Sequence, residues 1–296
     1  MPWRGLAVRG SRHEGDEVAE GGGPGVGIGE EGDRGPVQDD LEPFGEAVGR
    51  MVLPPGRLAS GEARGGGRER KDRRPRRHGQ QRARGVVVDF MGLGNQWMSK
   101  PEDGPRGAAF AAAGAVYVVP YLDPWNWMNA GAVAATDRIL DLVFGRAGLP
   151  ADAPVVSTGG SMGGLCALVW PRYTRHRVAA VAANCPVCDL PFHYTERPDL
   201  PRTLRAAFGA EPDFAAALRA RSPLHLAPEL PDVPHAVFHC TEDRLVDKAA
   251  HSDKFVAAMR ALGRRVEYVE VPGRGHCDLD DAAKRRYADF ALEALS

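Results

Sequence analysis

The sequence has no long hydrophobic run and few cysteines. None of its apolar stretches reaches the roughly 18–20 residues that span a bilayer, so we expect no transmembrane helix and no membrane partner. The N-terminus lacks a basic segment followed by an apolar core, so we expect no signal peptide. The five cysteines among 296 residues are irregularly spaced. This pattern does not fit a disulfide framework and favours a reducing compartment, the cytoplasm.

Two of the cysteines, Cys185 and Cys188, form a C-x-x-C motif. Zinc sites of this type use a second pair at a suitable spacing, and the sequence has none. A redox role has no further support, so we interpret both residues as small side chains that end a strand. We therefore expect no metal and no organic cofactor.

From residue 85 onward, strand-like apolar runs alternate with helical segments. We predict strands over 85–90, 115–120, 154–157, 178–184, 235–240 and 266–271, and helices over 105–113, 130–146 and 249–262. Such alternation is typical of an α/β fold, with a mostly parallel sheet and helices on both faces. Residues 85–296 are long enough to form one large core.

Residues 155–164 carry the most specific chemical motif of the chain. Gly159, Ser161 and Gly163 form G-x-S-x-G between a short apolar run and a helical segment. This context is typical of a nucleophile elbow, a sharp turn that exposes the serine hydroxyl between strand and helix. The glycines leave room for a crowded backbone there. A plain glycine–serine loop is the alternative, so the prediction needs partners for Ser161.

A serine nucleophile needs a general base and an acid that orients the base. Asp243 comes just after the strand 235–240, and His276 ends a glycine-rich loop after the strand 266–271. We predict that Ser161 is the nucleophile, His276 the base and Asp243 the orienting acid.

Other residues could take these roles. Glu242 and Asp247 are acids of the same loop as Asp243, and each of the three could instead be a solvated or helix-capping residue. His239 lies inside a predicted strand, where we expect a buried histidine with hydrogen-bonded partners. Ser157 lies on the strand before the elbow and has no glycines around it.

The reaction also needs two backbone donors for the oxyanion. One is expected to be the N–H of Met162, which follows the nucleophile. The loop after the strand 85–90 is rich in glycine, and the amide of Gly92 or Leu93 is our candidate for the second donor. An ordinary glycine-rich turn is the alternative.

With these residues in place, the chain resembles the α/β-hydrolase superfamily, and within it the prolyl oligopeptidase-like (peptidase S9) and esterase branch. The resemblance covers residues 85–296 and rests on the segments 159–163, 242–246 and 273–276. It implies a serine hydrolase with the chain order serine, aspartate, histidine. Many relatives carry His-Gly in the first oxyanion loop, where this chain has Met91 before the glycine, so a backbone donor is retained without a histidine side chain.

Residues 1–84 differ sharply from the rest of the chain. They are rich in glycine, arginine, glutamate and proline and lack apolar periodicity, so we expect them to be disordered. The basic run 68–77 could attract nucleic acid, but no aromatic residues interleave it, and we expect no nucleic-acid partner. An α/β-hydrolase normally begins with antiparallel strands, and the sequence of residues 1–84 shows no pattern that predicts one. We hypothesise that 1–84 arise from a misplaced start or a shifted reading frame.

Two regions are expected to shape the substrate pocket. Between 189 and 230 the strand–helix alternation breaks, with many prolines and a short helix near 214–220, which predicts a small helical lid. Loop aromatics at the sheet edge and polar lid residues are the candidate pocket residues: Trp97, Tyr121, Trp125, Trp127, His193 and Tyr194. The alternative is that the aromatic rings only hold their loops down.

The charged lid residues Glu196 and Arg197 leave a question about the substrate open. Glu196 could hold a peptide amine, or Arg197 a carboxylate, and an exposed helix end would explain both residues equally well. We therefore predict a serine hydrolase that cleaves an ester or peptide-like acyl bond in a small molecule or short peptide. A catalytically inactive binding protein with the same fold is the alternative, and the sequence does not indicate an oligomeric state.

Overall fold

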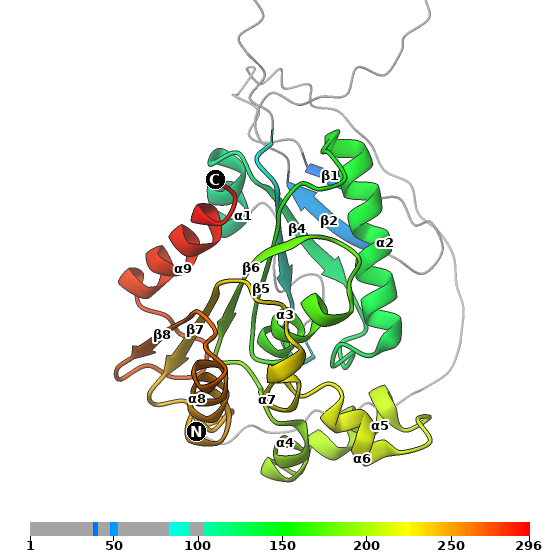
Figure 1. Cartoon of the computed structure of the whole chain (residues 1–296), viewed down its shortest axis with the longest axis vertical. Helices are drawn as coiled ribbons and strands as arrows, with labels where there is room; N and C mark the ends of the chain where they lie inside the picture. The colour runs from blue at the N-terminus through cyan, green and yellow to red at the C-terminus, as the bar shows by residue number, and fades with distance from the viewer. Residues whose placement is uncertain (1–37, 41–47, 53–82, 95–103) are drawn as a thin grey trace, which may run out of the picture. The chain divides into compact units, whose positions relative to one another are not determined.

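A computed structural model describes residues 38–40, 48–52, 83–94 and 104–296. Within these residues, eight strands form one sheet in the order β1-β2-β4-β3-β5-β6-β7-β8 (Figure 1). The six strands from β3 to β8 are all parallel to one another, whereas β2 pairs antiparallel with β4 and β1 antiparallel with β2. The strands are β1 (Gln38–Asp40), β2 (Val48–Val52), β3 (Val86–Phe90), β4 (Val116–Tyr121), β5 (Val155–Gly160), β6 (Val178–Asn184), β7 (His235–Cys240) and β8 (Val266–Val271).

Helices connect the parallel strands, as the alternating sequence pattern predicts. Between the strands lie α1 (Pro105–Ala112), α2 (Ala130–Ala147), α3 (Met162–Tyr173), η3 (Ala249–Asp253) with α8 (Lys254–Ala261), and finally α9 (Asp281–Glu293). The predicted lid region contains α4 (Leu190–Glu196), α5 (Leu200–Phe208), α6 (Phe214–Arg219), α7 (Pro223–Leu226) and η2 (Ala227–Glu229). All of these lid elements lie between β6 and β7 in the sequence. Among the described residues, no helix is both long and apolar enough to cross a membrane.

The central strands β3 to β7 are buried on both faces because most of their residues are apolar or small. Along β3, Val86 and Val88 belong to one hydrophobic cluster and Val87 to another, as expected when successive side chains point to opposite faces. The first cluster also takes in α2, α3 and α8, and the second takes in α1 and α9. Figure 1 shows α1 and α9 on one side of the sheet and α2 on the other.

The expectation that no strand precedes residue 85 is wrong for two short segments. β2 pairs antiparallel with β4, with Val48 opposite Tyr121, and β1 pairs antiparallel with β2. Sequence reasoning missed them because a strand of three residues and one of five are too short to show a pattern within a glycine-rich region. The other parts of 1–84 lie outside the described residues, so the proposed origin of this segment stays a prediction.

The topology brings the predicted site residues to one edge of the sheet. β3 ends before Gly92, β5 ends before Ser161, β7 ends shortly before Asp243, and β8 ends shortly before His276. Because parallel strands end at the same edge, the loops that carry these residues meet there, where open α/β sheets bind their ligands.

Candidate active site

Ser161 lies on a strained turn between β5 and α3. Its backbone has φ 60° and ψ −124°, a conformation that a residue with a side chain rarely adopts. The N–H of Ser161 donates to the main-chain oxygen of Asn184 at 2.9 Å, and its own carbonyl accepts from Leu165 at 3.1 Å. The elbow is therefore held by the neighbouring strand β6 and by the first turn of α3.

The glycines of the motif are required by close backbone approach. A Cβ atom on Gly159 would lie 2.2 Å from the carbonyl oxygen of Gly163, and one on Gly163 would lie 2.2 Å from the carbonyl oxygen of Phe90. Real Cβ contacts are never this short, so any side chain would force β3, β5 and α3 apart. The G-x-S-x-G sequence is thus explained by the packing of the turn.

His276 and Asp243 are in direct contact. The Nδ1 atom of His276 lies 2.6 Å from the Oδ2 atom of Asp243, and the Asp243 side chain is fully buried. Because Nδ1 is engaged by the carboxylate, the Nε2 atom is the imidazole nitrogen left to face the cavity. The alternative acids Glu242 and Asp247 are exposed.

The Asp243 carboxylate is held by four donors. Its Oδ1 atom accepts the N–H groups of Leu245 and Val246 at 2.8 and 3.1 Å, and the Nε2 atom of His239 lies 3.4 Å from Oδ2. Burial raises the pKa of Asp243, but the hydrogen bonds from His239 and His276 outweigh burial and hold it well below its usual value. Asp243 is therefore an anion at neutral pH.

His239 is fully buried, as expected for a core histidine. Its ring also contacts the hydroxyl of Ser252 at 2.7 Å and the carbonyl of Val246 at 3.3 Å. The His239 ring thus helps to hold the loop that carries Asp243. Ser157, the other serine of β5, is buried and donates to the carbonyl of Ala167.

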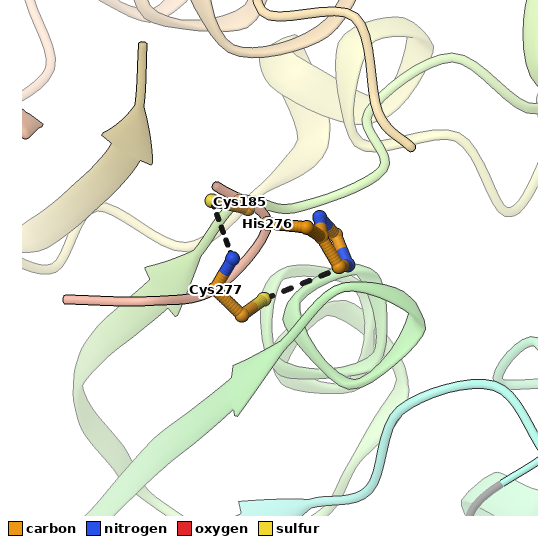
Figure 2. A group of neighbouring side chains, drawn as sticks. All are labelled: Cys185, His276 and Cys277. Atoms are coloured by element: carbon orange, nitrogen blue, oxygen red, sulfur yellow. Dashed lines mark hydrogen bonds between the residues drawn. The ribbon is translucent and has the colours of Figure 1, made fainter. Parts of the chain in front are cut away.

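The thiols of Cys185 and Cys277 lie close to the His276 ring. Figure 2 shows the Cys277 sulfur turned toward the imidazole, and the Sγ–Nε2 distance is 3.7 Å. The N–H of Cys277 donates to the Cys185 sulfur at 3.4 Å. Burial lowers the pKa of His276, but hydrogen bonds to Asp243 and Cys185 outweigh burial and raise it to about 9.

A cavity of about 430 Å³ joins these residues. This volume lies within the range of small-molecule sites. Its walls come from the oxyanion loop, the elbow, the lid and the acid and histidine loops. The lining residues are Gly92, Leu93, Arg106, Trp127, Gly159, Gly160, Ser161, Asn184, His193, Arg197, Leu245, Val246, His276, Cys277 and Tyr287.

The predicted oxyanion donors belong to segments at the same cavity as Ser161. Gly92 and Leu93 line the cavity, and Met162 is the first residue of α3. The first N–H groups of a helix have no acceptor within it, so the Met162 N–H is available to a developing negative charge. These positions fit the oxyanion hole that the sequence predicts.

Two of the six predicted pocket residues line the cavity. Trp127 and His193 do so, with ring centroids 5.5 Å apart. The Trp127 indole N–H donates to the hydroxyl of Thr203, so the lid helix α5 fixes this ring. Trp97 lies outside the described residues.

The three other aromatic residues are not among the lining residues of this cavity, so their role in substrate binding stays a prediction. Tyr194 contacts Phe214 inside the lid, and Trp125 lies against the guanidinium of Arg202. Tyr121 ends β4 beside β2. The rings of Tyr194 and Trp125 are thus occupied by packing against lid helices, which was the alternative that the sequence left open.

Sequence reasoning missed several lining residues. Asn184 is the last residue of β6, and its position at the carboxyl end of a strand is a signal that could have identified it. Tyr287 reaches the cavity from the middle of α9, and its hydroxyl accepts the N–H of Gly159 at 3.0 Å. Arg106 comes from the first turn of α1. Nothing in their local sequence marks Tyr287 or Arg106.

The parallel sheet, the strained serine turn and the buried aspartate–histidine pair define a serine hydrolase with the α/β-hydrolase fold. A model of the prolyl oligopeptidase family matches residues 147–294, which is half of the chain, and the chain belongs to that family. A search among curated proteins finds no match.

Solved structures share this fold at low sequence identity. An esterase from Thermogutta terrifontis with bound propionate is 20% identical, with a TM-score of 0.59, 88% of this chain covered and 93% of that chain. A puromycin-hydrolysing peptidase from Mycobacterium tuberculosis is 18% identical, with a TM-score of 0.57 and 88% and 38% covered. Dipeptidyl peptidase 4 from Porphyromonas gingivalis is 14% identical, with a TM-score of 0.62 and 88% and 35% covered. The chain thus spans nearly all of the esterase but little more than a third of the two peptidases.

Proposed function

We propose that the protein hydrolyses an ester or a peptide-like acyl bond through an acyl-enzyme on Ser161. The observation that carries the proposal is the 2.6 Å contact of His276 with the buried Asp243, beside a strained Ser161 that lines the same cavity. A buried carboxylate that holds one imidazole nitrogen leaves the other to act as a base.

The reaction begins with His276 accepting the hydroxyl proton of Ser161 through Nε2, while the serine oxygen attacks the substrate carbonyl. The oxyanion accepts hydrogen bonds from the N–H of Met162 and from that of Gly92 or Leu93. Protonated His276 then donates its proton to the leaving group as the carbonyl re-forms. Its positive charge is stabilised throughout by the anionic Asp243.

The second half of the reaction releases the acyl group. A water molecule gives a proton to Nε2 of His276 and attacks the acyl carbon, and the returning proton frees Ser161. The lid helices α4 and α5 supply His193 and fix Trp127 at the cavity, so they shape the space beside the acyl group. The fold neighbours include an esterase with propionate and a peptidase that hydrolyses puromycin, which favours small acyl and aminoacyl substrates.

Hydrolysis of a panel of short-chain aryl esters and aminoacyl arylamides tests this function. We expect turnover of at least one class, with a pre-steady-state burst of the aryl leaving group, because the acyl-enzyme forms before it is hydrolysed. Ser161→Ala and His276→Ala should each lower kcat by about 10⁴- to 10⁶-fold. A folded protein with no turnover on the panel would favour the inactive binding protein instead.

All five cysteines are free in the structure, and none is paired in a disulfide. The cytoplasmic location and the absence of a nucleic-acid partner remain predictions from the sequence. The basic run 68–77 lies outside the described residues.

A further inference from the structure

The cavity beside Ser161 carries positive charge. Its described lining residues include two arginines, Arg106 and Arg197, and no aspartate or glutamate. His193 also lines the cavity, and burial lowers its pKa. A substrate that enters this cavity therefore meets two guanidinium groups and no negative side chain on the described wall.

Glu196, the lid acid that could have held a peptide amine, is committed elsewhere. Its Oε2 atom lies 2.5 Å from Nδ1 of His193 and 3.0 Å from Nε2 of His251, and its Oε1 atom accepts the N–H of Asp247 at 2.8 Å. Oε1 thus joins α4 to the loop after Asp243, and Oε2 joins it to η3 through His251. Glu196 is not among the lining residues of the cavity.

Arg197, the next residue, has donors left for a ligand. Its Nε and Nη2 atoms donate to the two carboxylate oxygens of Asp199 at 3.1 and 2.9 Å, and Nη1 contacts the carbonyl of Leu245 at 3.4 Å. A guanidinium has five N–H donors in a rigid plane, so two remain after these contacts. Arg197 is thereby held in a fixed orientation at the cavity wall, with its side chain 26% exposed.

Arg106 is held in a similar way on another wall. Its Nη1 atom lies 3.2 Å from the fully buried carboxylate of Asp89, and its guanidinium lies over the ring of Tyr287 at 5.6 Å. Almost half of its side chain is exposed. Because Asp89 holds one end of the Arg106 guanidinium, the side chain needs little further ordering when its remaining N–H groups bind a ligand.

We propose that the substrate carries a carboxylate in addition to the bond that is cleaved, and that Arg197 binds this carboxylate with support from Arg106. This inference rests on the proposed hydrolase function of Ser161. A planar guanidinium with two neighbouring donors matches the two oxygens of a carboxylate. A pocket without such donors would not distinguish an anionic from an uncharged substrate, whereas the remaining N–H groups of Arg197 and Arg106 favour the anion.

Two pairs of matched esters test the proposal. The para-nitrophenyl monoester of succinic acid is compared with para-nitrophenyl pentanoate, which places the carboxylate on the acyl side. The acetate ester of meta-hydroxybenzoic acid is compared with phenyl acetate, which places it on the leaving group. In at least one pair, kcat/KM should be roughly 10- to 100-fold higher for the anionic ester, the range of a charge-assisted hydrogen bond.

Arg197→Gln separates recognition from folding. Asp199, the carboxylate that pairs with Arg197, is already about half exposed. Removing the guanidinium therefore leaves no buried charge without a partner. The substitution should lower kcat/KM by about tenfold or more for the preferred anionic ester and by less than about twofold for its neutral partner. If the substitution acted by loosening the lid, kcat/KM would instead fall by the same factor for both esters of the pair. Arg219→Gln, at an exposed lid position, is the matched control and should change neither.

Two results would overturn the proposal. One is a neutral ester hydrolysed at least as fast as its anionic partner in both pairs, and the other is an equal effect of Arg197→Gln on both members of a pair. If no ester is hydrolysed at all, the proposed function fails instead. Calorimetric binding of the succinate monoester to Ser161→Ala, with and without Arg197→Gln, then still decides whether an anion site exists.

Discussion

The main-chain oxygen of Asn184 accepts the N–H of Ser161 at 2.9 Å. The side chain of the same asparagine donates through Nδ2 to the carbonyl of Cys277 at 3.2 Å, one residue beyond His276. Asn184 thus joins the nucleophile turn to the histidine loop, although the two are more than a hundred residues apart in the chain. The last residue of β6 thus contacts both of the segments that carry the proposed nucleophile and the proposed base.

Asn184→Ala should therefore slow the chemical step more than it weakens binding. The substitution keeps the main-chain contact to Ser161 and removes only the hydrogen bond to Cys277. We expect kcat to fall by about tenfold with KM changed by less than about twofold, since a small misplacement of a catalytic group is costly. Steady-state kinetics measure this, with Thr195→Ala in the exposed lid as the control. A rise in KM alone would contradict the positioning role.

Asp243→Asn should nearly abolish activity without unfolding the chain. The amide cannot stabilise the imidazolium and favours the wrong histidine tautomer, so kcat should fall by about 10⁴-fold. Circular dichroism would show that the fold is retained. If activity fell by less than tenfold, one of the exposed acids Glu242 or Asp247 would have to replace Asp243 in the mechanism.

The pH dependence of kcat/KM follows from the state of His276. The base must be neutral, so activity rises as pH rises through its pKa, which the contacts with Asp243 and Cys185 place above the ordinary value of about 6.5. In Asp243→Asn, burial remains and the carboxylate is lost, so the midpoint should move to lower pH. A midpoint that stays the same in both proteins would show that another group controls the profile.

The sequence predicted the parallel sheet and the residues that meet at the sheet edge, because each depends on a local pattern, whereas the role of 189–230 as a lid stays a prediction. The strand that ends before Ser161 and the glycines at 159 and 163 are such patterns. The contributions of Arg106 and Tyr287 could not be predicted, since each depends on which elements lie side by side, whereas the place of Asn184 at the end of β6 was a signal that the sequence offered. β1 and β2 were missed because a short edge strand is specified mainly by pairing with its neighbour, here β4.

Glu196→Gln should destabilise the lid. The carboxylate accepts from His193, His251 and the N–H of Asp247, and hydrogen bonds to a charged group contribute about 1.5–3 kcal/mol. We expect a loss of that order in the free energy of unfolding, measured by urea denaturation at pH 7. Glu211→Gln, at an exposed position, should have no effect.

The loss of stability in Glu196→Gln should depend on pH. Burial raises the pKa of Glu196, but the hydrogen bonds from His193 and His251 outweigh it, so the pKa in the folded state lies well below its usual value. Its contribution is present above the unfolded value of about 4.3 and is lost as pH falls toward the folded one. The difference in stability between wild type and Glu196→Gln should shrink below about pH 4. A difference that grows with acidity would contradict this contact.

Two glycine-to-alanine substitutions should change the free energy of unfolding in opposite directions. In Gly163→Ala the new Cβ would lie 2.2 Å from the carbonyl oxygen of Phe90, so we expect a loss of at least about 1–3 kcal/mol and a large fall in activity. Gly145 lies inside α2 with open space around it, and Gly145→Ala should stabilise the fold by about 0.5–1 kcal/mol. Thermal unfolding compares both. Equal effects would show that crowding at the elbow is not the cause.

The most direct test of the account is the reaction of the purified chain with a fluorophosphonate, followed by mass spectrometry. An activated serine should gain one phosphonyl group per chain, located on Ser161, and His276→Ala and Ser161→Ala should remain unlabelled. A folded chain that gains no adduct, or carries it on another residue, would contradict the assignment of Ser161 as a nucleophile activated by His276.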